Sequence, residues 1–160
     1  MPSRFRTLAA AVVLAAIALT VSLVAVSAAG PAAGPNVTRI AVVEHATTDV
    51  VVDLTTNGDS TGDLLTFHNE LFDESNTEVV GSNQGECVRI EVGVSWECRW
   101  VNFFEGGSIT VEGPFFDAGP SAFAITGGTG SFRNARGSMR LVARDDAGTE
   151  YDFIFRILND

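Results

Sequence analysis

The spacing of apolar residues after Asn36 is the feature that most constrains the fold. No stretch there keeps the i, i+3, i+4 apolar pattern of an amphipathic helix, whereas short alternating or apolar runs separated by Gly, Asp, Asn and Ser recur throughout. In the last run, aromatic and aliphatic residues occupy every second position from Tyr151 to Ile157. Successive strand residues point to opposite faces, so one face of this strand is packed. The pattern predicts an all-β domain.

Eight strands joined by short, polar, glycine-rich connections are predicted. They cover residues 38–45, 63–72, 85–92, 95–104, 108–115, 122–126, 138–144 and 149–158. A domain of about 132 residues then has roughly 16 residues per strand and turn, which suits an eight-stranded antiparallel up-and-down β-barrel, since closure removes the exposed strand edges. A two-sheet sandwich is the structural alternative.

Residues 1–28 form a separate N-terminal segment. Two arginines near its start precede an apolar run from Leu8 to Val26, and the segment ends in the small residues Ser27 and Ala28. This order is typical of a secretory signal peptide that is cleaved after Ala28. An uncleaved membrane anchor is the alternative, because the run is long enough to span a bilayer. We therefore expect a secreted, extracellular protein.

The remaining chain has the composition of one acidic domain. Residues 29–37 are rich in Ala, Gly and Pro and read as a flexible spacer, and residues 38–160 have the length of a single domain. The chain has 20 acidic residues against 10 arginines and no lysine, for a formal net charge of −10. Such a charge repels phosphate backbones and anionic lipids. We expect no nucleic-acid partner and, after signal cleavage, no membrane partner.

Cys87 and Cys98 are the only cysteines, and export would place them in an oxidising compartment. They flank two predicted strands that turn near Val92-Gly93. With a two-residue turn they lie directly opposite each other, close enough for a cross-strand bridge in a non-hydrogen-bonded pair. The spacing predicts a Cys87–Cys98 disulfide.

Two segments have the composition of ligand-binding loops. Gly127–Gly130 has the glycines of a phosphate loop, but strand-like segments flank it and no helix follows, so a tight turn or bulge is favoured. Residues 57–63 alternate oxygen donors as a calcium loop does, but His68 stands where that loop needs Glu, so a solvated connection is favoured. His45 and His68 are the only histidines and show no zinc-ligand spacing. We expect no metal and no cofactor.

Glu44 follows the apolar run of residues 40–43. If Val42 lines the barrel interior, alternation puts Glu44 there too, and burial would raise its pKa and fit it for proton transfer. If Val43 faces inward instead, Glu44 is solvated. Asn69 poses the same choice between a hydrogen-bonding residue of the pocket and a polar residue beside a turn.

Five groups of residues along the domain carry a family resemblance. They are Gly62-Asp63-Leu64 with Phe67 and Asn69, Gly85-Glu86-Cys87, Thr110–Phe115, Ala124–Phe132 and Ala135-Arg136-Gly137. In this order they resemble the superfamily of allene oxide cyclases and dirigent proteins, over about residues 40–158. The resemblance implies an eight-stranded barrel with an apolar internal cavity, commonly a homotrimer. The surplus of aromatic residues agrees with such an assembly.

The resemblance also implies roles for particular residues. By position, Glu44 matches the first-strand glutamate of the plant cyclases, Asn69 matches a cavity asparagine, and Cys87 matches a cavity cysteine. Further matches to substrate-binding positions are Phe67, Trp96 and Phe115 in the aromatic wall and Arg136 in the dirigent pocket. The second asparagine position of the plant cyclases holds Ala46 here, and no Ser-Pro pair follows.

Two classes of function remain open. One is a barrel that binds a hydrophobic small molecule and acts on it, either as a cyclase or isomerase with Glu44 and Asn69 as catalytic residues, or as a dirigent-like guide of a reactive intermediate. The other is a non-catalytic barrel that binds a hydrophobic ligand or serves as a scaffold, since a fold does not by itself establish a function.

The signal prediction has a direct test. We expect the secreted form to begin near Ala29, because a signal peptidase cleaves after small residues that follow an apolar run. Intact-mass measurement of the secreted product checks this. A membrane fraction whose protein retains residues 1–28 would contradict it.

Overall fold

The computed structural model describes residues 36–55 and 58–158, so the predicted signal peptide and residues 29–35 of the predicted spacer lie outside the described residues. The strands are β1 (Val37–His45), β2 (Val50–Val52), β3 (Leu64–Asp73), β4 (Val79–Glu91), β5 (Ser95–Phe104), β6 (Gly107–Phe116), β7 (Ser121–Gly130), β8 (Gly137–Ala143) and β9 (Glu150–Leu158). Within these residues there is no helix with the length and apolar character needed to cross a membrane.

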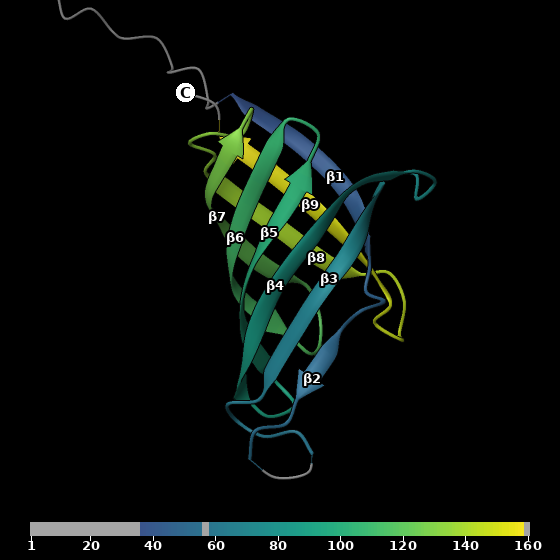
Figure 1. The fold of residues 1–160 in the computed structure, drawn as a ribbon, viewed down its shortest axis with the longest axis vertical. Coiled ribbons are helices and arrows are strands. Elements are labelled where there is room, and N and C mark those ends of the chain that lie inside the picture. The colour runs from purple at the N-terminus through teal and green to yellow at the C-terminus, as the bar shows by residue number, and fades with distance from the viewer. Residues whose placement is uncertain (1–35, 56–57, 159–160) are drawn as a thin grey trace, which may run out of the picture. The chain divides into compact units, whose positions relative to one another are not determined.

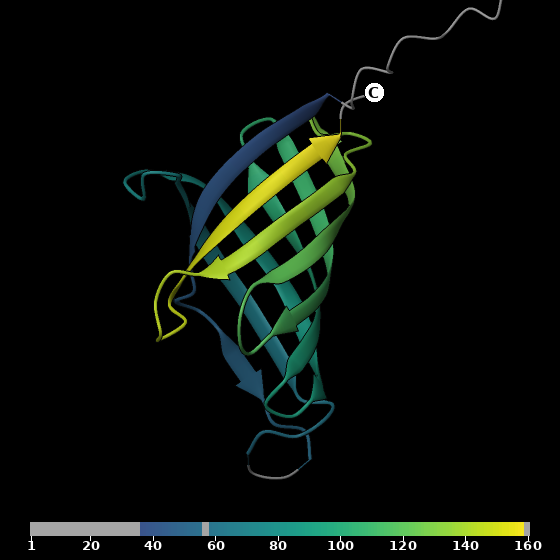
Figure 2. The same ribbon diagram turned by 180° about the vertical axis from the view of Figure 1, so that it is seen from behind.

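Eight of these strands form a closed antiparallel barrel, which confirms the predicted fold (Figure 1). Neighbouring strands pair in the order β1-β9-β8-β7-β6-β5-β4-β3-β2, and β1 also pairs with β3. On the opposite side of the barrel, β1 and β9 run beside each other along their whole length (Figure 2). The contact of β1 with β3, from Val42↔Asp73 to His45↔Glu70, closes the circle.

The short strand β2 was not predicted. It pairs only with the start of β3, from Val50↔Thr66 to Val52↔Leu64. Its three valines are exposed, so they lack the alternation of buried and exposed residues that reveals a strand. Because β1 ends at His45, β2 takes the place of β1 beside the lower part of β3 in Figure 1.

Gly127–Gly130, for which a tight turn or bulge was predicted, form the end of strand β7. A bulge lies directly before them, since β6 and β7 change register between Thr110 and Val111. Glycine is needed here for close packing: a side chain at Gly128 would come within 2.3 Å of the Phe132 carbonyl oxygen. Strand β4 also starts earlier than predicted, at Val79 rather than Gly85.

The barrel interior is packed mainly around Trp100 of β5. Its indole makes edge contacts with Phe123 and Phe67, at ring-centroid distances of 4.4 and 5.9 Å. Gly85 of β4 pairs with Trp100, and a side chain at Gly85 would lie 2.3 Å from the Trp100 Cβ. The missing side chain at Gly85 therefore allows β5 to approach β4 closely at Trp100. Toward the end where β1 begins, the interior is solid, with Ile109, Met139 and Phe155 fully buried.

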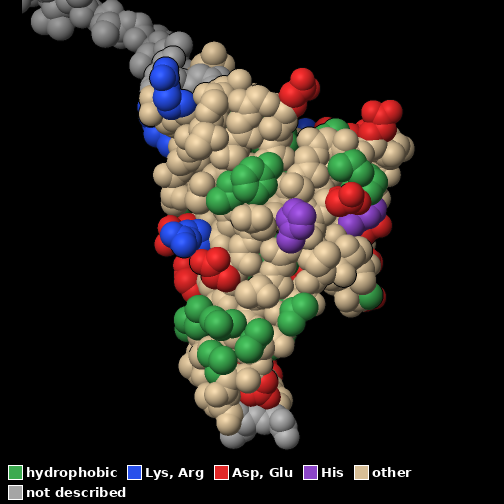
Figure 3. Space-filling model, viewed as in Figure 1, with side chains coloured by type: hydrophobic (Ala, Val, Ile, Leu, Met, Phe, Trp, Pro, Cys, Tyr) green, Lys and Arg blue, Asp and Glu red, His purple; other side chains and the backbone are tan. Residues whose placement is uncertain are grey.

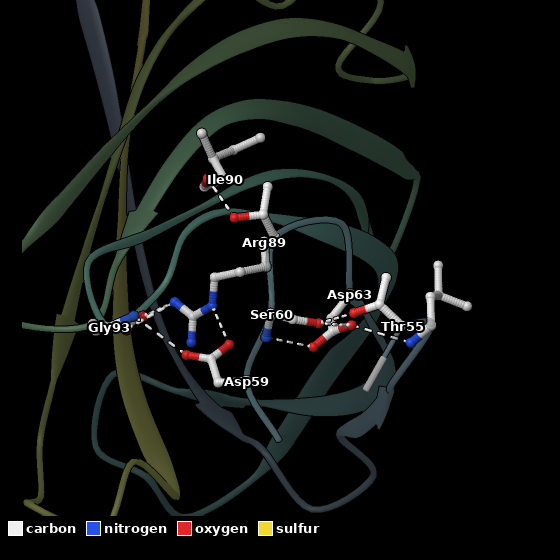
Figure 4. Close-up of polar contacts among 10 residues, drawn as sticks. Thr55, Asp59, Ser60, Asp63, Arg89, Ile90 and Gly93 are labelled. Atoms are coloured by element: carbon white, nitrogen blue, oxygen red, sulfur yellow. Dashed lines mark hydrogen bonds and ion pairs between the residues drawn. The ribbon is translucent and has the colours of Figure 1, made fainter. Parts of the chain in front are cut away.

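Arg89 closes the other end of the barrel. Its guanidinium lies 4.0 Å from the Trp96 ring centroid, Nε donates to Asp59 Oδ1 at 2.7 Å, and Nη1 donates to Asp117 at 2.7 Å. The two aspartates belong to the β2–β3 and β6–β7 connections, so one buried arginine ties two loops across the barrel end. Figure 4 shows the contact with Asp59.

The connection that resembled a calcium loop is held by hydrogen bonds to Asp63 and by contacts with Arg89, Ile90 and Gly93 (Figure 4). Asp63 is fully buried and accepts hydrogen bonds from Leu54 N at 3.1 Å, Ser60 N at 2.8 Å and Ser60 Oγ at 2.9 Å. These bonds, the one from Leu54 first, hold the pKa of Asp63 below its usual value. In the described parts of the chain no group of three or more His, Cys, Asp or Glu is placed to hold a metal ion.

The predicted Cys87–Cys98 disulfide is present, with the two Cα atoms 4.0 Å apart. The turn has three residues rather than two, but the strands change register between Arg89 and Glu91. This bulge compensates for the longer turn, so the two cysteines still face each other.

Removing the disulfide should lower stability. Its loop has a sequence separation of 11, and on the chain-entropy model we expect Cys87→Ala/Cys98→Ala to lose about 2–3 kcal/mol in free energy of unfolding. Urea denaturation measures this, with the reduced wild-type protein as the matched control. Alkylation of both thiols in denatured but unreduced protein would show that the bond is absent.

Candidate functional site

A cavity of about 160 Å³ lies inside the barrel toward the end where β1 stops. Its apolar wall consists of Leu65, Phe67, Cys87, Cys98, Trp100, Phe115, Leu141 and Phe153. Its polar lining is Glu44, Asp49 and Tyr151. Asp49 is exposed and Tyr151 half-buried, so we call these two residues the mouth. The mouth exists because β1 leaves the barrel after His45 and continues into β2, which pairs with β3 and not with β9.

Glu44 points from β1 into this cavity and is only 5% exposed. Its Oε1 accepts hydrogen bonds from Asn69 Nδ2 at 3.2 Å and from Asn83 Nδ2 at 2.5 Å. Its Oε2 has no bond to another described residue, and in the described part of the chain no fully buried polar side-chain atom lacks a partner. Oε2 is therefore the oxygen that faces the open space of the cavity.

Burial raises the pKa of Glu44 to about 7, and the negative charge of Asp49 acts in the same direction. The hydrogen bonds from Asn83 and Asn69 favour the carboxylate but offset burial only in part. No cation is among the causes of this shift. Near neutral pH the group therefore populates both its protonated and its ionised form.

Asn69 positions Glu44 and the chain that follows it. Its Oδ1 accepts from Thr47 N at 3.1 Å and Thr48 N at 3.0 Å, and its Nδ2 also donates to Asp49 Oδ1 at 2.8 Å. The donors and the acceptor of this amide are thus occupied by the protein itself. Asn69 fixes the direction of the Glu44 carboxyl and the course of the mouth.

A row of three buried asparagines crosses the barrel wall, and two of them were not predicted from the sequence as site residues. Asn69, Asn83 and Asn102 are paired in register across β3, β4 and β5. Asn102 accepts from Trp100 Nε1 at 3.2 Å and so orients the indole. Asn83 lies outside the predicted strand of residues 85–92. Asn102 lies on the same face of its predicted strand as Trp100, and this position could have indicated that it is buried. Asn83 supplies the second amide to Glu44, where the resemblance pointed to the position of Ala46.

Tyr151 was expected only as a packed residue of the last strand. Its ring meets Phe115 edge-on at a centroid distance of 6.0 Å, so it continues the aromatic wall to the mouth. Burial and the charges of Glu44, Asp49 and Asp145 raise the pKa of Tyr151 to about 12. Its hydroxyl therefore stays protonated and available as a donor.

The structure brings together some of the expected site residues and separates others. Phe67 and Phe115 line the cavity with Glu44 and the disulfide. Trp96 is buried beneath Arg89 at the closed end and is not among the lining residues. Arg136 is exposed at the start of β8, near the end of β9 and far along the barrel from the mouth. Its position gives no contact with the cavity.

Solved structures share the fold of this chain. A pyocyanin demethylase is 20% identical with a TM-score of 0.64, covering 74% of this chain and 100% of its own. The pterocarpan synthase dirigent protein PsPTS1 is 20% identical with a TM-score of 0.63, covering 78% and 97%. The Diels-Alderase AbmU from Streptomyces koyangensis is 14% identical with a TM-score of 0.59, covering 79% and 71%.

The sequence comparison assigns the family. Residues 30–157, nearly the whole domain and its predicted spacer, match the family described as dirigent-like protein. This agrees with the resemblance found in the sequence and with the closed barrel. The chain therefore belongs to the dirigent-like protein family.

Proposed function

We propose that this protein is a secreted barrel that binds a hydrophobic small molecule in its cavity, and that Glu44 exchanges a proton with it. The barrel would then act as a cyclase or isomerase, or guide a reactive intermediate. One observation carries the proposal: a buried carboxyl group presents a free oxygen to an apolar cavity.

The proton chemistry follows from the two oxygens of Glu44. Oε1 is held by two amides, so the carboxyl cannot rotate freely and Oε2 keeps its direction before a ligand arrives. With a pKa of about 7, Glu44 is protonated in some protein molecules and ionised in others at neutral pH, so it can act as a proton donor or as a proton acceptor. The Tyr151 hydroxyl adds a neutral donor at the mouth.

Cavity size favours a substrate with a ring over one with a long acyl chain. A cavity of 150 Å³ in another protein holds benzene, and the cavity here is about 160 Å³. One six-membered ring would fill it, and the rest of a larger molecule would extend through the mouth. Three aromatic residues of the lining, Phe67, Trp100 and Phe115, suit such a ring.

The names of the structural neighbours also support a substrate that contains a ring. A pterocarpan synthase, a Diels-Alderase and a pyocyanin demethylase share this barrel; pterocarpan and pyocyanin are ring compounds, and a Diels-Alder reaction forms a ring. Family membership supports the guiding of a reactive intermediate. The disulfide is in keeping with an oxidising compartment and supports secretion. A homotrimer remains part of the proposal, on the resemblance.

Glu44 should titrate near pH 7 rather than near its ordinary value of about 4.3. Because the folded state holds this proton more tightly, its contribution to stability is complete below about pH 4 and disappears as pH rises through about 7. The free energy of unfolding of Glu44→Gln, relative to wild type, should therefore rise by about 3 kcal/mol from pH 4 to pH 8.

Carbon-detected NMR of the carboxyl groups, assigned by the signal lost in Glu44→Gln, measures the titration, and urea denaturation at several pH values measures the stability. Glu97→Gln, which removes an exposed carboxylate from β5, is the control for loss of one negative charge. An ordinary titration of Glu44 would remove the proton-transfer part of the proposal.

Ligand analysis tests binding itself. We expect freshly purified protein to release a ring-bearing apolar molecule when it is denatured, and mass spectrometry to detect that molecule. Glu44→Gln should still bind the molecule but no longer convert it to product, because the substitution keeps the shape of the side chain and removes the acid. Conversion unchanged in Glu44→Gln would favour the non-catalytic binding barrel. Failure of any apolar molecule to bind would contradict both.

A further inference from the structure

We propose that the cavity selects a small ring that carries a positive charge, such as a protonated amine or a cationic nitrogen heterocycle, over neutral and anionic rings of the same size. The inference rests on the proposed function, because it specifies the chemical class of the ligand. The ring would occupy the apolar wall, and the positive nitrogen would lie between Glu44 Oε2 and the mouth.

The charges around the cavity have one sign. Glu44 and Asp49 line it, and Asp145 is close enough to act on the Tyr151 hydroxyl. No arginine or histidine is among the described residues that line it. A cation brought to this place would meet uncompensated negative charge, and a carboxylate would be repelled.

Two basic side chains near the cavity, Arg89 and His45, interact with residues other than Glu44. Arg89, at the closed end, is engaged by Asp59 and Asp117. His45 follows Glu44 in the chain, but its ring stacks on Phe72 at 3.9 Å and its Nε2 lies 2.8 Å from Asn76 Oδ1. Neither neutralises the Glu44 carboxyl.

The aromatic wall adds a second attraction for a cation. Phe67, Trp100, Phe115 and Tyr151 surround the space beside Glu44. Aromatic faces carry negative electrostatic potential, and they attract cations more strongly where water is excluded. Apolar walls alone would suit any ring, but aromatic walls beside a carboxyl that has no cationic partner among the described residues favour a charged one.

Binding of a cation should depend on pH in a defined direction. The titratable groups facing the Glu44 carboxyl are Asp49, from the β1–β2 connection, and Tyr151, from β9; Asn69 and Asn83 of β3 and β4 are neutral. A cation binds the ionised form of Glu44, so its affinity should rise as pH increases toward and past 7 and then level off. A neutral ring should show no such rise.

Three probes of matched size test the inference with the full secreted protein: benzylamine, benzyl alcohol and phenylacetate, each titrated by calorimetry at low salt. At pH 8 we expect benzylamine to bind about tenfold more tightly than benzyl alcohol, since a charge-assisted hydrogen bond is roughly twice as strong as a neutral one. Phenylacetate should bind more weakly than the alcohol. At pH 5.5 the advantage of the amine should shrink.

Variants separate the charge from the cavity. Glu44→Gln and Asp49→Asn should each reduce the preference for benzylamine while keeping the affinity for benzyl alcohol, which also shows that the variants fold. Glu97→Gln, on the outer side of β5, should keep the preference. Equal binding of amine and alcohol, or a preference that persists in both cavity variants, would overturn the inference but leave the proposed binding function standing. Absence of binding by all three probes would overturn both.

Discussion

The pairing of β1 with β3 is the interaction on which the barrel and its cavity both depend. It spans only four residue pairs, from Val42↔Asp73 to His45↔Glu70. Within this short contact the sheet becomes a closed barrel, and directly after it β1 ends and the mouth begins. The exposed outer side of the wall is reinforced here, since His45 stacks on Phe72 and Arg39 donates to Glu74 at 2.7 Å. The end of β1 at His45 therefore determines both how the barrel closes and where the mouth of the cavity lies.

Glu44 lies within that contact, opposite Leu71, and this explains its unusual environment. A strand that closes a barrel must send every second side chain inward, so a carboxyl at this position is removed from water. An isolated buried carboxylate is costly, and proteins offset the cost with hydrogen bonds or by holding the proton. Both occur here: two amides bind Oε1, and the raised pKa keeps a large neutral population.

The two ends of the barrel show how packing restricts the functional space. At the end where β1 begins, large side chains fill the interior, and at the opposite end Arg89 and Trp96 form a closed layer tied to two loops. The cavity lies between these two layers, and Asp49, which follows β1, is an exposed residue of its lining. The three valines of β2 are exposed, as are Val79 and Val88 of β4. Figure 3 shows that apolar side chains reach the surface in several separate places on this face.

The sequence by itself determined the all-β class, the number of barrel strands and the disulfide, and it reduced Glu44 to a choice between two faces that the closed barrel decided. Each of these follows from local alternation or from the spacing of two cysteines, which depends on neighbours along the chain or across one hairpin. Asn83, Asp49 and Tyr151 became site residues only through tertiary structure, because they come from separate strands and connections that closure brings together. The same closure excluded Trp96 and Arg136. The position of a residue in a strand sets the face of the sheet on which its side chain lies. The shift between neighbouring strands of the closed barrel decides how far along the barrel axis that side chain lies, and so which side chains of other strands it contacts.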